Sequence, residues 1–159
     1  MHRASIHRPA GHWPTERASG SLTLDFDARH RRRICLVTDQ GEDILVDLPK
    51  AVAMANGDAL QLEDGRLLRV EAAAEPVVEV RHQFQAQLMR LAWHLGNRHL
   101  AAEIQKDFLR IRPDRVIEEM LHGFGAELAK VQVPFQPEGG AYGHHGHSHD
   151  HRGEERDHE

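Results

Sequence analysis

The chain has 159 residues, a formal net charge of −5 and 40% hydrophobic residues, which allows one domain or two small ones. The acidic balance argues against a general nucleic-acid-binding protein, which we expect to carry a basic domain. The single cysteine, Cys35, excludes an intramolecular disulfide and a cysteine-based zinc cluster. No apolar run approaches the ~18 residues of a membrane span, and no secretion signal is evident. We therefore expect a soluble cytoplasmic protein without a membrane partner.

Residues 1–19 contain prolines and scattered histidines without a hydrophobic period, and we interpret them as a loose N-terminal arm. Strand patterns begin at residue 21, where Leu22 and Leu24 alternate with polar residues. The stretches 32–38 and 43–49 continue the pattern on either side of a turn at Gly41. We expect Cys35 to be a buried thiol in one of these strands. Residues 20–75 are thus predicted to form a small β-domain.

Beyond Pro76 the patterns predict a strand, a helix, two short strands, a second helix and a last strand. The first helix, residues 82–97, is expected to carry Gly96 at its C-cap, and the second is expected to begin at Pro113. The apolar residues expected to be buried on the two helices are Phe84, Leu88, Leu91, Ala92, Leu95, Val116, Ile117, Met120, Leu121 and Phe124. This order of elements is the split βαβ, or ferredoxin-like, arrangement, which we assign to residues 76–136.

Residues 137–159 form a histidine-rich tail that is expected to be disordered, because it is too polar and glycine-rich to fold. Five of its histidines follow each other closely: His144, His145, His147, His149 and His151. Neutral imidazole binds zinc, copper, nickel and cobalt, so this stretch predicts metal binding without selecting the metal. The alternatives are a purification tag, which is normally an uninterrupted run, and a tail that only increases solubility.

The motif HLGNRH, residues 94–99, contains two further histidines. His99 follows the end of the predicted helix, where it would lie at an exposed corner. Considered alone, such a histidine is more often a surface residue than a ligand. His94 lies within the helix, next to its apolar face, and we expect a packing or capping role for it.

Other charged residues offer no catalytic arrangement. The run from Arg29 to Arg33 could bind phosphate or RNA, but it falls between strands, and we expect a solvated turn there. Glu118 and Glu119 are adjacent and diverge on a helix, which is poor geometry for a pair of catalytic carboxylates. The chain has neither an HExxH motif nor a phosphate-binding P-loop. We therefore predict a binding protein and not an enzyme.

Several stretches together resemble the UreE family of urease accessory proteins, the nickel metallochaperones of urease assembly. They are LTLDFDARHRRR, LPKAVAMANGDALQLEDGRLLRVEAAAEPVVEV, WHLGNRH, DRVIEEMLHGFG and PFQPEGGAYGHHGHSH. WHLGNRH and the last stretch are the most specific of them. The resemblance runs from about Leu22 to the C-terminus and leaves residues 1–19 outside.

The resemblance implies an α+β protein with three parts. They are an N-terminal β-domain similar to the peptide-binding domain of a heat-shock cochaperone, a ferredoxin-like metal-binding domain, and the disordered tail. It also implies a homodimer formed through the second domain, with nickel bound at the dimer interface by His99. The family passes nickel to the urease accessory GTPase UreG and to the apo-urease complex. A two-fold axis beside His99 would supply two imidazoles, because the same residue from both subunits would meet there.

The predicted function is nickel delivery for urease assembly, with His99 and tail residues His144, His145, His147, His149 and His151 as metal ligands. Zinc or copper could also bind in vitro. The alternative is a metal storage or buffering protein in which the tail is the whole function. An RNA-binding module is disfavoured, because Phe108 and Phe135 are the only aromatic residues predicted on the sheet of the second domain.

Overall fold

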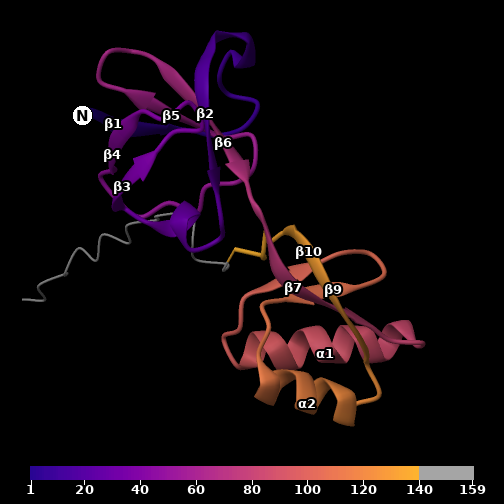
Figure 1. Ribbon diagram of the computed structural model, residues 1–159. Helices are drawn as coiled ribbons and strands as arrows, with labels where there is room; N and C mark the ends of the chain where they lie inside the picture. Colours follow the sequence, from indigo (N-terminus) through magenta and orange to yellow (C-terminus); the bar gives the residue numbers. More distant parts are fainter. Residues whose placement is uncertain (140–159) are drawn as a thin grey trace, which may run out of the picture.

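The computed structural model describes residues 1–139, and its first part, residues 2–72, forms a six-stranded sheet in the order β2-β6-β5-β1-β4-β3 (Figure 1). The strands are β1 (His2–Arg8), β2 (Ala18–Leu24), β3 (Arg33–Val37), β4 (Asp43–Asp47), β5 (Ala59–Leu62) and β6 (Leu67–Ala72). Two 3-10 turns, η1 (Thr15–Arg17) and η2 (Ala28–His30), flank β2. The predicted turn between β3 and β4 is confirmed, since Gly41 has a φ of 88° that suits a glycine.

The interpretation of residues 1–19 as a loose arm is wrong, because β1 lies in the middle of this sheet. Its first residues pair in parallel with β4, and the strand continues in antiparallel pairing with β5. The strand has no hydrophobic period because the one side chain that it buries completely is the small Ala4. Trp13 anchors the following loop by donating its Nε1–H to the Gly57 carbonyl oxygen at 3.0 Å.

The core of the first part is built from buried aliphatic residues of β1, β2, β4, β5 and β6, together with Leu48 and Met54, and β3 adds the partly buried Ile34 and Leu36. The fully buried members include Leu22, Ile44, Val46, Leu60 and Val70. Each such side chain contributes roughly 1.5–3 kcal/mol relative to an exposed position. Cys35 does not join them: contrary to expectation, its side chain is exposed on β3.

The second part is a four-stranded antiparallel sheet in the order β10-β7-β9-β8, with two helices on one face (Figure 1). Its elements are β7 (Ala74–Arg81), α1 (Gln85–Asn97), β8 (Ala102–Ile104), β9 (Leu109–Ile111), α2 (Arg115–Gly123) and β10 (Glu127–Pro134). The predicted order of strands and helices is confirmed, and the sheet order is that of a split βαβ arrangement. The chain passes from one sheet to the other between Ala72 and Ala74.

The helices bury a narrower face than the sequence predicted. Leu88, Leu91 and Leu95 of α1 pack on the sheet together with Ile117 and Leu121 of α2. Three side chains expected in this core are instead exposed: Phe84, Val116 and Phe124, with 60%, 72% and 45% of their surfaces accessible. Each helix packs one stripe of side chains against the sheet, and a residue beside that stripe or at a helix end projects away from the core.

Helix α2 begins at Arg115, two residues later than predicted, and Asp114 is its N-cap residue. The Asp114 carboxylate accepts a hydrogen bond from the Ile117 N–H at 3.1 Å, and the Asp114 N–H donates to the Glu118 carboxylate at 3.0 Å. This reciprocal arrangement satisfies amide groups that would otherwise lack partners at the helix start.

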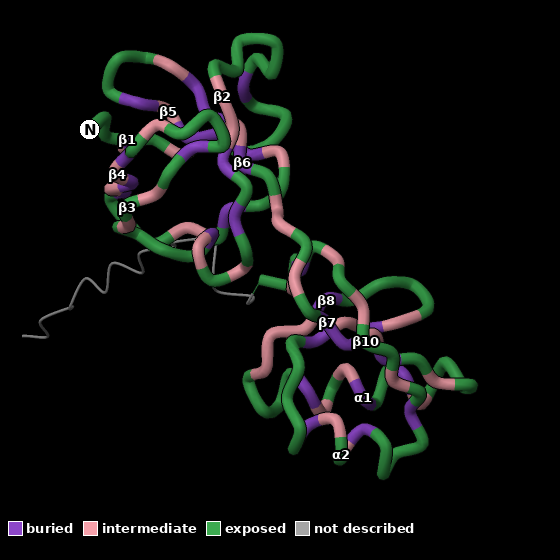
Figure 2. The backbone as a smooth tube through the Cα atoms, in the orientation of Figure 1, coloured by how far each residue is buried: buried purple, intermediate pink, exposed green. Residues whose placement is uncertain are grey.

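The two parts contact each other around the start of β7. Arg112 donates to the Asp27 carboxylate at 2.9 Å and lies over the Phe26 ring, which in turn packs against Phe135 at 5.3 Å between centroids. The Phe26 N–H also donates to the Glu75 carboxylate at 2.8 Å. The buried residues nevertheless form separate core clusters in the two parts (Figure 2). Among residues 1–139, no helix has the length and apolar character needed to cross a membrane.

Candidate metal site

Helix α1 ends in a Schellman motif, and His99 occupies its left-handed position. The Leu100 N–H donates to the Leu95 carbonyl oxygen at 3.1 Å, and the His99 N–H donates to the Gly96 carbonyl oxygen at 3.0 Å. His99 has a φ of 57°, and among residues 1–139 it is the only non-glycine residue with a positive φ. Leu100 packs against the same core as Leu95, as is usual for this motif.

The prediction that Gly96 caps the helix is therefore wrong. Gly96 lies within α1, and the position that usually selects glycine is occupied by His99, three residues later. Left-handed backbone costs an ordinary side chain about 1 kcal/mol, and such conformations are concentrated at functional sites. A histidine in this energetically costly position, with an exposed side chain, points to a functional role for the imidazole.

Within residues 1–139, no group of three or more histidine, cysteine or carboxylate side chains could hold a metal ion. The residue after His99, Leu100, lines a hollow of about 410 Å³ together with Ala101, Ile111, Arg112, Pro113, Asp114 and Ile117, without an imidazole or thiol. Its one carboxylate, Asp114, is occupied by the α2 cap. His99 therefore needs ligands from outside the described part of its own chain if it is to bind a metal tightly.

Two other histidines of this domain have local partners. His94 stacks on Phe124 with ring centroids 4.8 Å apart and meets the edge of Trp93 at 5.1 Å, so the expected packing role is confirmed. The Phe84 N–H donates to His82 Nδ1 at 3.0 Å, and His82 Nε2 lies 3.2 Å from the Phe124 carbonyl oxygen. These contacts give both rings a structural role.

The predicted ligands His144, His145, His147, His149 and His151 lie outside the described residues. The structure does describe the segment that leads to them. The Glu138 N–H donates to the Ala102 carbonyl oxygen at 2.8 Å, which ties this segment to the beginning of β8. Since Ala102 follows His99 by three residues, this hydrogen bond ties the segment that leads to the tail to a residue close in the chain to the candidate ligand.

Arg29 is a buried residue that the sequence analysis assigned to a solvated turn. Its side chain is 2% exposed, and its guanidinium donates to the carbonyl oxygens of Met54 and Phe135. Burial lowers the pKa of Arg29, although the negative charges of Glu75, Asp25 and Asp58 oppose this effect. The neighbouring residues 30–33 are exposed, as expected. No local sequence signal distinguishes Arg29, because its partner Phe135 lies 106 positions away.

The two parts of the chain each match a known family model. The model of the UreE urease accessory protein N-terminal domain matches residues 3–73, and that of the UreE C-terminal domain matches residues 75–159. The chain belongs to the UreE urease accessory protein family. The match from residue 3 includes most of the segment that the resemblance was expected to leave out.

Three relatives illustrate the similarity, and each is named urease accessory protein UreE. The protein of Rhodopseudomonas palustris strain BisB18 is 51% identical over 96% of this chain and 72% of its own length. The Chelativorans protein is 50% identical over 90% of this chain and 92% of its own length. The protein of Bradyrhizobium strain ORS 278 is 53% identical over 84% of this chain, which spans 64% of that protein. All three names describe accessory proteins and not enzymes.

Proposed function

We propose that this UreE family member is a metallochaperone that binds nickel and delivers it for assembly of the urease active site. The observation that carries the proposal is the left-handed backbone of His99 at the capped end of α1. Its main chain is fixed by two hydrogen bonds before a metal arrives, and its ring is exposed. Preorganisation of this kind raises affinity without additional contacts.

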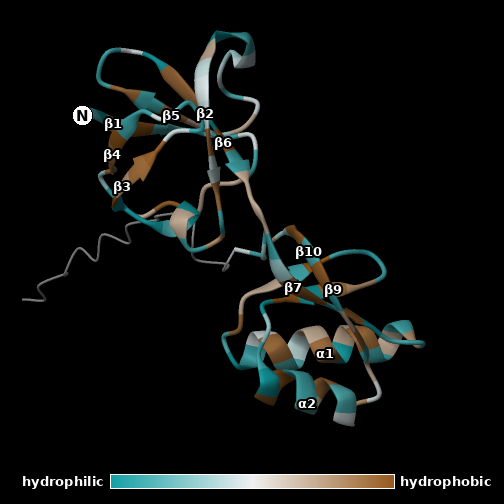
Figure 3. Ribbon diagram, viewed as in Figure 1, coloured by the Kyte–Doolittle hydropathy of each residue, from teal (hydrophilic) through white to brown (hydrophobic). Residues whose placement is uncertain are grey.

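A homodimer would provide a second imidazole for the same ion. Among residues 1–139, nine large apolar residues are exposed, and five of them lie on the two helices or at their ends: Phe84, Met89, Trp93, Val116 and Phe124. Met89 and Trp93 are four positions apart and therefore lie on one side of α1. Hydrophobic and hydrophilic segments alternate along this helix (Figure 3). An apolar surface on the domain that carries His99 supports association of two copies through this domain.

The tail histidines would complete the ligand set. Six residues separate His144 from Glu138 along the chain, a reach of at most about 22 Å. His99 and Ala102 are three residues apart, a separation of at most about 11 Å. The first tail histidine can thus reach His99. Tail histidines would collect nickel, and the His99 pair would hold it for transfer to the partner GTPase UreG and the apo-urease complex.

Nickel titration combined with sedimentation tests the proposal in chains that end at Gly143. We expect the parent chain to bind nickel tightly as a dimer and His99→Gly to lose that site, because the glycine preserves the backbone conformation and removes the ligand. His122→Ala, at the exposed end of α2, is the matched control and should bind as the parent does. Unchanged tight binding in His99→Gly would place the tight site elsewhere in the folded chain and overturn the proposal, whereas a parent chain that loses all tight binding when it ends at Gly143 would favour a storage protein that acts through its tail.

A further inference from the structure

The segment Phe135–Glu138, which we name the strap, connects β10 to the histidine-rich tail and is held by both parts of the protein. The Phe135 side chain is fully buried, and its carbonyl oxygen accepts a hydrogen bond from Arg29. The Gln136 side-chain oxygen accepts from the Asn56 N–H at 2.9 Å. On the other side, the Gln136 N–H donates to the Glu103 carboxylate at 2.9 Å, and the Glu138 N–H donates to Ala102.

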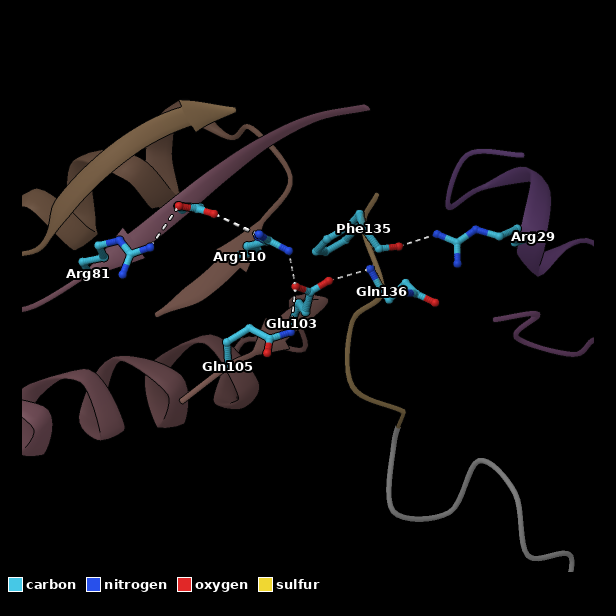
Figure 4. Close-up of polar contacts among 8 residues, drawn as sticks. Arg29, Arg81, Glu103, Gln105, Arg110, Phe135 and Gln136 are labelled. Atoms are coloured by element: carbon cyan, nitrogen blue, oxygen red, sulfur yellow. Dashed lines mark hydrogen bonds and ion pairs between the residues drawn. The ribbon is translucent and has the colours of Figure 1, made fainter. Parts of the chain in front are cut away.

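Glu103 is the central member of this set (Figure 4). It lies in β8 and is 5% exposed. One carboxylate oxygen accepts the Gln136 N–H, and the other accepts from Arg110 at 2.8 Å and from Gln105 at 3.2 Å. Arg110 also donates to Glu79 at 3.0 Å, so its charge keeps a partner when Glu103 is neutralised. A buried carboxylate needs such partners, and here one of them is the strap backbone.

The strap changes the edge of the sheet from which the tail departs. β10 and β8 lie at opposite edges of the four-stranded sheet, three strand intervals or about 14 Å apart. Without the strap, the chain after Pro134 would leave beside β10. The hydrogen bonds to Glu103 and Ala102 bring it to β8, the strand that follows His99.

We propose that Glu103 is a positioning residue that, through the strap, fixes the origin of the tail beside His99 and so favours binding of tail histidines to the metal at that site. The inference rests on the proposed function, since it requires that His99 and the tail share a metal. A ligand attached close to its target binds with a high effective concentration, which decreases when the attachment point moves away. Glu103 thereby strengthens metal binding without touching the metal.

The experiment compares two substitutions that remove a carboxylate from the same arginine. Glu103→Leu, combined with Gln136→Ala, removes the acceptor of the Gln136 N–H and the side-chain contact to Asn56, whereas Glu79→Leu, combined with Gln132→Ala, disturbs Arg110 and β10 without a strap contact. Nickel affinity is measured for both double variants in the full chain and in the chain that ends at Gly143. Hydrogen exchange of the Gln136 and Glu138 amides reports whether the strap has opened.

We expect the strap variant to exchange both amides faster and to bind nickel roughly three- to tenfold more weakly in the full chain. In the chain that ends at Gly143, the strap variant should bind nickel with the same affinity as its parent. The Glu79 variant should match the nickel affinity of the parent in both chain lengths. An equal loss in both chain lengths would mean that Glu103 acts on the His99 site itself, which overturns the inference. Retained amide protection, or unchanged affinity with an open strap, would also overturn it.

His99→Gly in the full chain separates this inference from the proposed function. If His99→Gly leaves the tight site intact, the proposed function fails, and the inference fails with it. If His99→Gly removes the tight site while the strap variant binds normally, the proposed function stands and only the strap inference is wrong.

Discussion

The Arg29 guanidinium donates a hydrogen bond to the carbonyl oxygen of Phe135, and this contact joins η2 of the first part to the segment that follows the last strand. Arg29 has no carboxylate in hydrogen-bonding contact among the described residues, and a second donor group of its side chain binds the Met54 carbonyl oxygen. The buried cation is thus held by backbone carbonyl oxygens on both sides of the junction, and the negative charges of Glu75, Asp25 and Asp58 also favour it.

Arg29→Met should lower the free energy of unfolding by roughly 2 kcal/mol, because two buried carbonyl oxygens lose their donors. Urea unfolding of the full chain measures the effect. Arg31→Met, two residues away and exposed, is the control and should change stability by less than about 0.5 kcal/mol. If Arg29→Met were as stable as the parent chain, the cost of burying the charge would cancel the gain from its hydrogen bonds.

His99→Gly should increase stability relative to His99→Ala by about 1 kcal/mol, because glycine adopts a φ of 57° without a steric penalty and alanine does not. Thermal unfolding of the metal-free variants measures this difference. The same pair of substitutions at Asn97, within α1, is the control and should show the opposite order. A more stable alanine variant at position 99 would argue against the left-handed conformation.

Hydrophobic periodicity predicted the second part well and the beginning of the chain poorly, for a physical reason. Leu88, Leu91 and Leu95 recur with the period of a helix, and their burial is confirmed. β1 buries only Ala4 completely and is held by pairing with β4 and β5, strands that begin about 40 and 55 residues later. Such pairing leaves no pattern within the strand itself.

The candidate site was predicted in part. The motif HLGNRH identified His99, but the glycine within it suggested the wrong capping residue, because α1 continues to Asn97 and the hydrogen bonds at its end place the left-handed residue at His99. Arg29 and Glu103 gave no local signal. Their importance depends on Phe135 and Gln136, which reach them only after the chain has folded.

The stability of the first sheet should decrease in acid through Asp58. Burial raises the pKa of this carboxyl, but hydrogen bonds from His7 and from the Ala55 and Ala10 N–H groups lower it, and the net pKa lies below its usual value. The unfolded chain therefore binds the proton more readily, near a pKa of about 3.9. The resulting stabilisation is present above that pH and is lost as the pH falls through the lower native pKa.

Asp58→Asn measures this contribution. The variant should be less stable than the parent by roughly 1–3 kcal/mol at pH 7, because the buried donors lose a charged acceptor. The difference should narrow as the pH falls below about 4. Urea unfolding at several pH values tests this, with Asp43→Asn, an exposed position, as the control. If the difference in unfolding free energy between parent and variant stayed constant from pH 7 to pH 3, the loss of stability would come from packing and not from the ionised carboxylate.

Nickel binding should itself depend on pH, because imidazole binds a metal only when it is deprotonated. An unperturbed histidine titrates near ~6.5, so occupancy of the full chain should fall steeply between about pH 7.5 and about pH 5.5. Equilibrium dialysis with nickel measures the occupancy, and the chain that ends at Gly143 should bind fewer ions throughout. An occupancy that stays level across this range would indicate carboxylate ligands such as Asp150, Glu154 and Glu155.

Trp93→Glu should weaken the proposed homodimer. The indole is 64% exposed on the same side of α1 as Met89, and a carboxylate in an apolar interface would lose its hydration without gaining a partner. We expect sedimentation equilibrium to show a dissociation constant at least tenfold higher, or about 1.4 kcal/mol. Val37→Glu is the matched control, because Val37 is similarly exposed, at 61%, but lies in the other domain.

Because an ion shared by two copies stabilises the dimer, nickel should partly restore association in Trp93→Glu and should not do so when His99→Gly is added. A dimer that withstands Trp93→Glu would move the interface away from α1 and would require another source for the second imidazole.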